Sequence, residues 1–305
     1  MGCGRQQSNA LFSSYQQEAS HLLQATQSSV SPELSLYKES EVRAMLAQFQ
    51  GGSVDLELDA ELHVATVTLS HVAKRNAFSG AMMLDFARCI DELDKWRSEG
   101  KIVILKGAKS QFCSGGDLEF VEAIADPVSG AKMSIFMQTA VSKFVQLPYL
   151  NVASVEGFAL GGGAELAVAC DLRLFESGAK IGFVQSKLGV STGWAGGTHL
   201  TRLVGPQKAL DLMASGRILS AQEASQIGLA DVILSPDQSA LDFLQQRYGS
   251  CSPKNMRAVK RIVSNAISCD YSESLNRERD IFTRMWGGPS HKRALETLKK
   301  KNNEK

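Results

Sequence analysis

Three consecutive glycines, Gly161 to Gly163, are separated by one residue from an acidic side chain, Glu165. They separate two apolar segments, which we expect to be a strand and a helix. Glycines in such a turn leave backbone N–H groups uncovered and directed at whatever lies over the start of the helix. An exposed pair of N–H groups can stabilise a negatively charged oxygen. The turn therefore predicts an oxyanion site.

A second glycine-rich loop lies upstream and also follows an apolar, strand-like segment. It contains Ser114, Gly115, Gly116 and Asp117. Loops at the carboxyl ends of neighbouring parallel strands face the crevice in which such sheets bind ligands. One N–H group from each loop would then converge on a single oxygen atom. Either loop alone is equally well explained as a tight turn, so the prediction depends on the two together.

The segments around these loops alternate in the manner of an α/β protein. Apolar periodicity predicts strands and helices in turn after the Gly51-Gly52 break. Such alternation indicates a largely parallel sheet. The expected strands are 62–69, 102–106, 150–155 and 172–175, and the expected helices are 81–96, 133–146 and 164–169.

The two ends of the chain differ from this middle part. Residues 1–50 are expected to form a flexible extension with one short helix at 42–49, followed by an α/β core over residues 51–250. Residues 251–305 are expected to be a C-terminal helical region that ends in a charged tail at 299–305. The elements expected after residue 205 are helices at 206–213, from 221, at 253–268 and at 272–286, and a weak strand at 232–234.

The composition indicates a soluble globular protein. The chain has 305 residues, of which 44% are hydrophobic, and lacks the run of about 18 apolar residues that a membrane helix needs. Its 33 basic and 32 acidic residues nearly cancel, so no overall field favours nucleic acid or an anionic membrane. Cysteines and histidines show no metal-site spacing. We expect a cytosolic protein with reduced thiols, no metal and no organic cofactor.

Longer motifs resemble the crotonase superfamily, also called the enoyl-CoA hydratase/isomerase family. They are F-C-S-G-G-D-L from Phe112, V-E-G-F-A-L-G-G-G-A-E-L from Val155, L-G-V-S-T-G-W-A-G-G-T from Leu188 and L-S-A-Q-E-A-S-Q-I-G-L-A-D from Leu219. In that family an acyl-CoA thioester binds with its carbonyl oxygen between two backbone N–H groups, which match Ser114 and Gly162 here. The resemblance also implies a ClpP-like spiral of β-β-α units, a helical C-terminal region, and a homotrimer or hexamer.

Compared with the hydratases of the family, the resemblance implies a site that has only one of the two catalytic glutamates. Hydratases of the family use two glutamates; Glu165 matches the first, and Gln185 stands at the position of the second. Glutamine has no titratable proton, so the two-glutamate mechanism is broken. Loss of CO₂ from a malonyl-type thioester needs only enolate stabilisation, about 3–4 kcal/mol per N–H donor, and one proton. We expect Glu165 to deliver that proton if burial raises its pKa; its alternative role is to orient the loop.

Further stretches resemble a vertebrate-type decarboxylase branch of the family. They include R-N-A-F-S-G-A-M-M-L from Arg75 and R-E-R-D-I-F-T-R-M-W-G-G-P from Arg277. The branch implies decarboxylation of ethylmalonyl-CoA and methylmalonyl-CoA to butyryl-CoA and propionyl-CoA, as metabolite repair in fatty acid metabolism. Two alternatives stay open. One is a hydratase or isomerase that uses Glu165 alone, and the other is a catalytically silent fold that binds RNA or a protein.

The resemblance assigns further residues to the substrate. Lys74 and Arg75 match basic residues that contact the CoA phosphates, although a solvated surface pair explains them equally well. Phe282 and Trp286 lie on a helix that, in this family, packs over the acyl or adenine pocket, with ordinary core packing as the alternative. The chain departs from the family at 191–194, where relatives carry a proline and one residue fewer. The predicted substrate-binding residues are Lys74, Arg75, Ala77, Gly115, Gly116, Asp117, Gly161, Gln185, Thr192 and Trp194.

Overall fold

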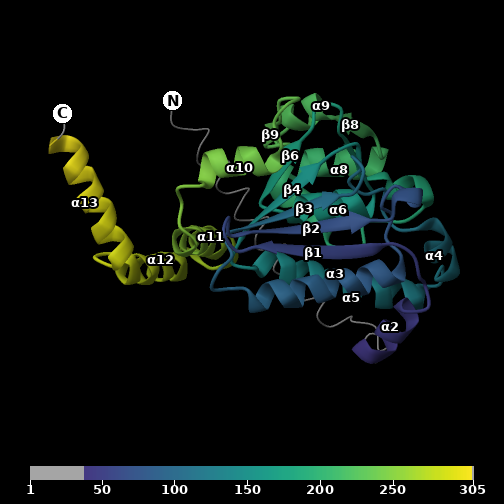
Figure 1. Cartoon of the computed structure of the whole chain (residues 1–305). Coiled ribbons are helices and arrows are strands. Elements are labelled where there is room, and N and C mark those ends of the chain that lie inside the picture. Colours follow the sequence, from purple (N-terminus) through teal and green to yellow (C-terminus); the bar gives the residue numbers. More distant parts are fainter. Residues whose placement is uncertain (1–37, 304–305) are drawn as a thin grey trace, which may run out of the picture.

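The computed structural model describes residues 38–303, and its centre is a six-stranded sheet with the order β1-β2-β3-β4-β6-β9 (Figure 1). Strands β1 and β2 pair antiparallel, whereas all later neighbours pair parallel. This largely parallel sheet confirms the α/β prediction. The strands are β1 (Ser53–Asp59), β2 (Val64–Ser70), β3 (Ile102–Gly107), β4 (Leu150–Val155), β6 (Leu172–Phe175) and β9 (Val232–Ile233).

A second, smaller sheet has the order β5-β7-β8. Its strands are β5 (Phe158–Leu160), β7 (Lys180–Gly182) and β8 (Ile218–Ser220). The chain passes through the large sheet and then the small one, from β4 to β5 and again from β6 to β7. Two isolated parallel bridges, Phe78 with Gly116 and Cys113 with Ala159, add earlier segments to this layer. The repeated passage is the spiral of β-β-α units that the resemblance implied, and both glycine-rich loops lie in its second layer.

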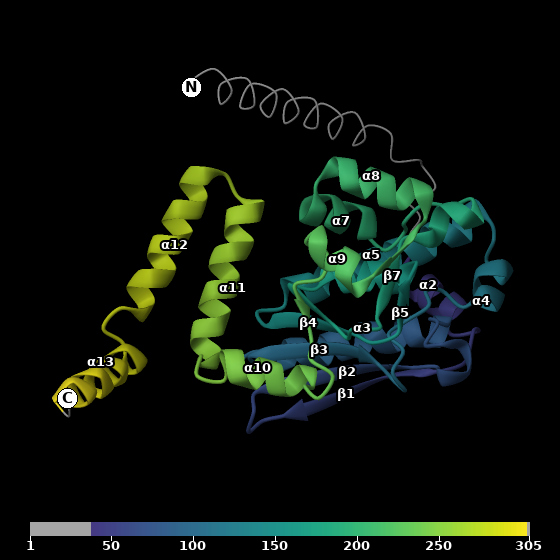
Figure 2. The same ribbon diagram turned by 90° about the horizontal axis from the view of Figure 1, so that it is seen from above.

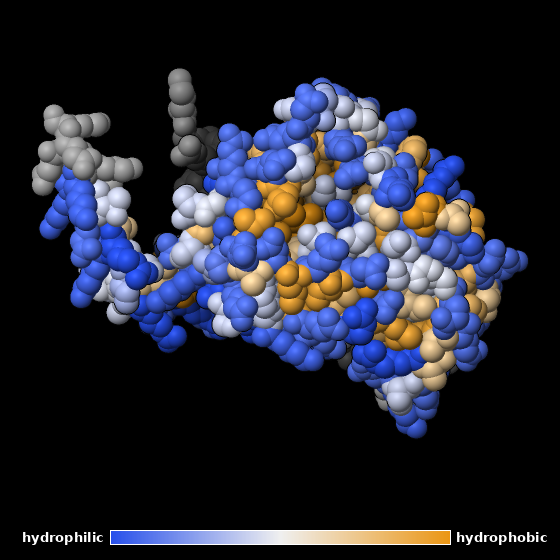
Figure 3. All heavy atoms as spheres, in the orientation of Figure 1, coloured by the Kyte–Doolittle hydropathy of each residue, from blue (hydrophilic) through white to orange (hydrophobic). Residues whose placement is uncertain are grey.

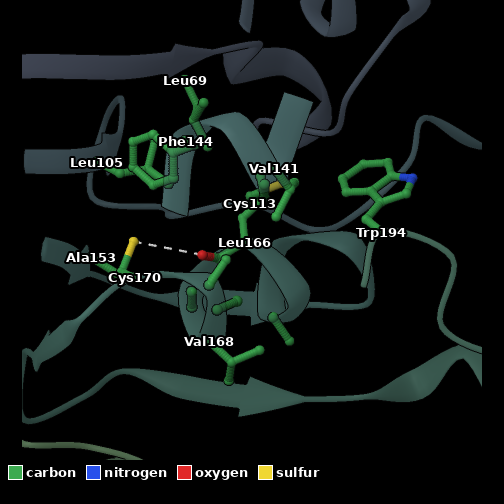
Figure 4. Close-up of a cluster of buried hydrophobic side chains, with 14 of the residues drawn as sticks. Leu69, Leu105, Cys113, Val141, Phe144, Ala153, Leu166, Val168, Cys170 and Trp194 are labelled. Carbon is green, nitrogen blue, oxygen red and sulfur yellow. Dashed lines mark hydrogen bonds between the residues drawn. The ribbon is translucent and has the colours of Figure 1, made fainter. Parts of the chain in front are cut away.

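Helices pack against the sheet and against one another. In Figure 1, α3 (Gly80–Lys95) and α5 (Pro127–Gln146) lie side by side below the strands. Helix α6 (Gly162–Ala169) is buried at every residue. Figure 4 shows its side chains Leu166 and Val168 within the apolar core. The other elements before residue 250 are α2 (Glu39–Leu46), η2 (Val72–Lys74), α4 (Leu118–Ala123), η3 (Val184–Leu188), α7 (Gly196–Val204), α8 (Pro206–Ser215), α9 (Ala221–Gln226) and α10 (Ala240–Tyr248).

Two helices begin earlier than their apolar periodicity predicted. Helix α5 begins at Pro127 instead of residue 133, because the Asp126 carboxylate accepts hydrogen bonds from the N–H groups of Val128 and Ser129, both at 3.0 Å. A capping aspartate followed by proline is a strong start signal, but the first turn lacks an apolar face. Helix α2 likewise begins three residues before the predicted 42–49. The predicted extension before residue 38 lies outside the described residues.

Three helices end the described chain, of which the first lies against the body and the other two extend away from it (Figures 1 and 2). They are α11 (Pro253–Ser268), α12 (Tyr271–Met285) and α13 (Pro289–Asn303). Helix α13 was not predicted, and it runs through the predicted charged tail as far as Asn303. Its lysines and asparagines follow a run of good helix formers, and the helix continues through them. Within residues 38–303, no helix is both long and apolar enough to cross a membrane.

Polar contacts attach α11 to the body. Lys260 is buried, and its Nζ donates to both carboxylate oxygens of Asp171, which follows α6. Arg257 Nη1 donates to the backbone carbonyl of Gly100 at 3.1 Å. Few apolar side chains of α11 are buried, so we infer that this ion pair fixes where the C-terminal helices leave the core.

Replacing Lys260 with alanine should destabilise the protein by about 3 kcal/mol. The change leaves the Asp171 carboxylate without its charged partner, and breaking a buried pair costs that order of free energy. Urea unfolding at neutral pH measures the loss. Lys254→Ala is the matched control, because Lys254 is exposed on the same helix. Equal stability of the two variants would show that the buried pair does not hold α11.

Candidate active site

The triple-glycine turn joins β5 to α6. Gly161 has φ 53° and ψ −121°, a conformation that glycine adopts without a steric penalty. Its N–H donates to the carbonyl of Gly182 at 3.0 Å, which ties the turn to β7. Gly162 is the first residue of the helix, so its N–H has no intrahelical acceptor, and none lies elsewhere among residues 38–303. Gly162, one of the predicted site residues, therefore has one uncommitted backbone donor.

The second donor is Gly116, two residues after the predicted Ser114. Phe78 donates its N–H to the carbonyl of Gly115 at 2.8 Å and accepts the N–H of Asp117 at 2.9 Å. This parallel bridge turns the N–H of Gly116 away from Phe78, and the described part of the chain offers it no acceptor. The N–H of Ser114, in contrast, donates to the carbonyl of another backbone residue at 3.1 Å.

The assignment of Ser114 as an oxyanion donor is therefore corrected to Gly116. Ser114 bonds to the carbonyl of Arg75 and so helps to fix the loop. In a regular strand, the N–H groups of residues i and i+2 point to the same side. Gly115 has φ 106°, which interrupts that regularity, so Ser114 and Gly116 direct their N–H groups differently. The sequence gives no sign of where this kink falls.

The two donor turns touch without a side chain between them. A Cβ atom on Gly115 would lie 3.1 Å from the carbonyl oxygen of Leu160 and 3.3 Å from the nitrogen of Gly162. Both distances are tighter than ordinary contacts. The backbone of one turn therefore approaches the backbone of the other at the position where both N–H groups are uncommitted. Such a pair of fixed donors can stabilise charge on one oxygen atom.

Glu165 lies directly behind this turn and is almost fully buried, with 2% of its surface exposed. Its Oε1 accepts from Gln185 Nε2 at 2.9 Å and from the N–H of Gly193 at 3.2 Å. Its Oε2 accepts from the N–H groups of Trp194 and Gly196, both at 2.8 Å. Burial raises the pKa of Glu165 above its ordinary value, and these four hydrogen bonds oppose the rise. The carboxyl therefore also holds the loop that contains Trp194.

Gln185, which the resemblance placed at the position of the second acid, lies on η3, and its amide nitrogen donates to Glu165 Oε1. Its buried Oε1 atom has no hydrogen-bond partner among the described residues. An amide turned by 180° would instead present this oxygen to Glu165 Oε1. The side chain can thus donate to a carboxylate or accept from a protonated carboxyl.

A hollow of about 810 Å³ opens beside Gln185, between η3, α7 and α8. Thr192 also lines it, so two of the predicted substrate-binding side chains meet there. The remaining wall mixes apolar and hydroxyl side chains with one arginine. These are Phe183, Ser186, Val190, Ser191, Gly197, Thr198, Thr201, Arg202, Leu210, Met213 and Ala214.

The side chain of Trp194 packs against the triple-glycine turn at Gly162. Its indole contacts Gly162 so closely that a Cβ on that glycine would lie 2.4 Å from Cζ3. The ring also packs edge-on against Phe78, with centroids 5.4 Å apart. Its Nε1 donates to Met133 Sδ at 3.1 Å. Sequence reasoning assigned no role to Phe78 or Met133, because neither adjoins a glycine loop in sequence.

The basic residues predicted for CoA occupy different environments. Lys74 Nζ donates to both carboxylate oxygens of Asp117 and contacts Glu119 Oε2 at 2.9 Å, so its charge is already paired. Arg75 is exposed, with a backbone φ of 52°. Ala77 is buried, and its carbonyl contacts the ring of a histidine. Of the two predicted cations, Arg75 is the better placed for an anionic ligand.

Cys113 adjoins the donor loop but is not suited to nucleophilic attack. Its side chain is fully buried, and burial raises the pKa of the thiol to about 12. A thiol in this state carries almost no thiolate at neutral pH. Its carbonyl and N–H bond to β5, so the residue holds the two layers together. Among residues 38–303, no group of three or more His, Cys, Asp or Glu side chains is placed to bind a metal ion.

Comparisons with known proteins agree on the family. The family model described as Enoyl-CoA hydratase/isomerase matches residues 59–304. The chain is 40% identical over 270 residues to the curated Mus musculus protein named "Ethylmalonyl-CoA decarboxylase", covering 87% of this chain and 82% of that protein. The Homo sapiens protein of the same name is 37% identical over 279 residues, covering 88% of this chain and 89% of that protein.

Solved structures share the fold at lower identity. An enoyl-CoA hydratase from Bacillus anthracis superposes with a TM-score of 0.74 at 28% identity, covering 83% of this chain and 97% of that one. An enoyl-CoA hydratase from Thermoplasma volcanium gives a TM-score of 0.72 at 26% identity, covering 80% and 96%. These likenesses confirm the predicted crotonase fold.

Proposed function

This chain belongs to the enoyl-CoA hydratase/isomerase family, and on that premise we propose that it is a carboxy-lyase that decarboxylates ethylmalonyl-CoA to butyryl-CoA. Curated relatives named "Ethylmalonyl-CoA decarboxylase" match most of the length of this chain. The observation that carries the proposal is the pairing of two uncommitted N–H groups, on Gly116 and Gly162, with a single carboxyl group. Gln185, at the position of the second acid, is already bonded to Glu165.

In the proposed reaction, the thioester carbonyl oxygen accepts hydrogen bonds from Gly116 and Gly162. The bond between Cα and the carboxylate carbon breaks, and its electron pair forms the enolate double bond while CO₂ leaves. Negative charge then develops on the oxygen held by the two donors, each worth about 3–4 kcal/mol to the transition state. One proton added to Cα completes butyryl-CoA.

Glu165 is the proposed source of that proton. Its raised pKa favours the acid form, as a proton donor requires. The two bonds to Oε2 are the shorter pair and come from backbone groups that cannot turn. Oε1 also accepts from a backbone N–H, that of Gly193 at 3.2 Å, but its other partner is the Gln185 amide, which can turn its unpaired oxygen towards it. We therefore assign the proton to Oε1. The same carboxyl keeps the loop after Gly193 in place.

Gln185→Glu should create measurable hydration of crotonyl-CoA, at least about 10²-fold above wild type. The change restores a second titratable group beside Glu165, and a positioned acid or base contributes about 10²- to 10⁴-fold. Loss of the ultraviolet absorbance of the conjugated enoyl thioester follows the reaction. Gln185→Met is the control, since it fills similar space without titrating. Rapid hydration by wild type would favour the hydratase alternative instead.

Methylmalonyl-CoA is the proposed second substrate, because it differs from ethylmalonyl-CoA by one methylene group. We place the protein in the cytosol, where it would remove carboxylated by-products of fatty acid synthesis. No step of the reaction requires a metal or an organic cofactor. Exposed Arg75 is the proposed contact for the CoA phosphates, since Lys74 is held by Asp117.

We also propose a homotrimer or a hexamer, assembled through the C-terminal helices. Helix α12 has no buried residue within the described chain, and Trp286 is 65% exposed. Figure 3 shows α12 and α13 as an arm that projects from the body. Apolar side chains in such a position need a partner surface. The exposed ones on α11 to α13 are Val259, Val263, Ile267, Tyr271, Leu275, Phe282, Trp286 and Leu295.

Light scattering on the purified protein should give about three or six times the chain mass of 33.0 kDa. Replacing Phe282 and Trp286 together with serine should shift that mass towards a single chain, because both rings lose the apolar contact that a partner surface provides. Leu58→Ser, an exposed apolar residue on β1, is the control. A wild-type mass of 33.0 kDa would contradict the assembly.

A further inference from the structure

We propose that Trp194 determines which substituent the substrate can carry at Cα. This inference rests on the proposed decarboxylation and deepens it. The indole forms a wall of the acyl site next to Gly162, and the size of that wall limits the alkyl group of the malonyl thioester. A protein with a smaller side chain at this position would therefore accept longer alkyl groups.

The position of the indole carries the inference. Ring atoms Cζ3, Cε3 and Cη2 all lie within 2.7 Å of where a Cβ on Gly162 would stand, so the ring rests on the backbone of that residue. The opposite contact is Phe78, at 5.4 Å between centroids and an interplanar angle of 62°. Phe78 in turn brackets Gly116 through its two backbone hydrogen bonds. The aromatic pair thus spans the gap from one donor turn to the other.

The indole is held rigidly enough to select by size. Its backbone N–H is fixed by Glu165 Oε2 at 2.8 Å, and the neighbouring Gly196 bonds to the same oxygen. At the far edge, Nε1 reaches Met133 Sδ on α5. Only 4% of the residue is exposed. A side chain fixed at both ends does not withdraw when a larger group arrives, so steric exclusion follows.

The chemistry of the substrate places its α-carbon against this wall. When the thioester oxygen lies between the N–H groups of Gly116 and Gly162, Cα is two bonds from that oxygen. We infer that a substituent on Cα lies against the indole, because the three atoms nearest to a Cβ position on Gly162 all belong to that ring. An apolar wall favours an alkyl substituent and disfavours a carboxylate there. One methylene group in such a pocket changes kcat/KM by about 10- to 200-fold.

The test compares kcat/KM for ethylmalonyl-CoA and butylmalonyl-CoA in wild type, Trp194→Leu and Trp194→Phe. We expect wild type to prefer the ethyl compound, and Trp194→Leu to shift the ratio towards the butyl compound by at least about tenfold. Trp194→Phe keeps an aromatic ring in the core and should give a smaller shift in the same direction. Trp96→Phe is the control, because Trp96 packs against Tyr149, outside the site. Unchanged ratios in folded Trp194 variants would overturn the inference.

Binding of the products separates this inference from the proposed function. Dissociation constants for butyryl-CoA and hexanoyl-CoA, measured by calorimetry, need no turnover. We expect Trp194→Leu to bind hexanoyl-CoA, relative to butyryl-CoA, at least about tenfold more tightly than wild type does. Such a shift supports the size limit even if no CO₂ is released. If wild type releases CO₂ but neither the kinetic nor the binding ratio moves, the proposed function stands and the role of Trp194 falls.

Discussion

Gly115→Ala should lower kcat for ethylmalonyl-CoA by about 10²-fold or more. A Cβ on this residue would press on the nitrogen of Gly162 and the carbonyl of Leu160, and φ of 106° is strained for alanine. Relief of that strain must separate the two turns, which misaligns both N–H donors. Loss of one such donor typically costs about 10²- to 10³-fold in kcat. We expect KM to change less than kcat, because the two donors act mainly on charge that develops in the transition state.

The control for this variant is Gly228→Ala. Gly228 also has a positive φ, of 81°, but no atom lies within 4 Å of the Cβ position, and the residue stands in the turn before β9. It therefore reproduces the backbone strain without touching the site. Steady-state kinetics on both variants, with thermal unfolding to confirm folding, gives the comparison. Equal activity of the two would mean that the contact between the donor turns is not needed for catalysis.

Glu165→Gln should reduce kcat by about 10²- to 10⁴-fold, the usual contribution of a positioned general acid. The variant also weakens the loop. A carboxamide puts an N–H₂ group against backbone N–H donors of Gly193, or of Trp194 and Gly196, so at least one of these buried donors loses its acceptor. Each buried donor left without an acceptor costs about 1–3 kcal/mol of stability. Kinetics and urea unfolding should therefore both change.

The pH dependence of kcat distinguishes proton delivery from support of the loop. Burial raises the pKa of Glu165, so its acid form persists to higher pH than for an exposed glutamate. If it delivers the proton, wild-type kcat falls as the pH rises through this raised pKa, and the fall is missing from the residual activity of Glu165→Gln. A supporting role alone leaves the two profiles parallel. Full turnover by the variant would exclude Glu165 from the proton step.

Much of the scaffold could be predicted because its signals are local. The strand over residues 150–155 and the helix over 253–268 have the predicted bounds, since each has a clear apolar pattern and a definite end. Strands β5 and β7 were missed, because three residues are too few to establish a period of two. They are recognised only through their partners in the second sheet.

The site could be predicted to the level of its loops but not of its atoms. Gly162 and the Gln185 position follow from short motifs. That Gly116 and not Ser114 has the uncommitted N–H group depends on the backbone dihedral angle φ of Gly115. The residue type does not determine this angle, because glycine adopts many conformations. The contacts from Glu165 to residues 193–196 join segments about thirty positions apart, and no periodicity links such segments. The wall formed by Trp194 is a consequence of those contacts.

The most direct test of the central claim supplies the purified protein with ethylmalonyl-CoA and, separately, with crotonyl-CoA. Release of CO₂ and formation of butyryl-CoA are measured in the first reaction, and formation of 3-hydroxybutyryl-CoA in the second. We predict rapid decarboxylation with hydration at least about 10²-fold slower. Rapid hydration without CO₂ release would contradict the proposed carboxy-lyase. Absence of both activities, together with salt-dependent RNA binding, would instead favour the catalytically silent alternative.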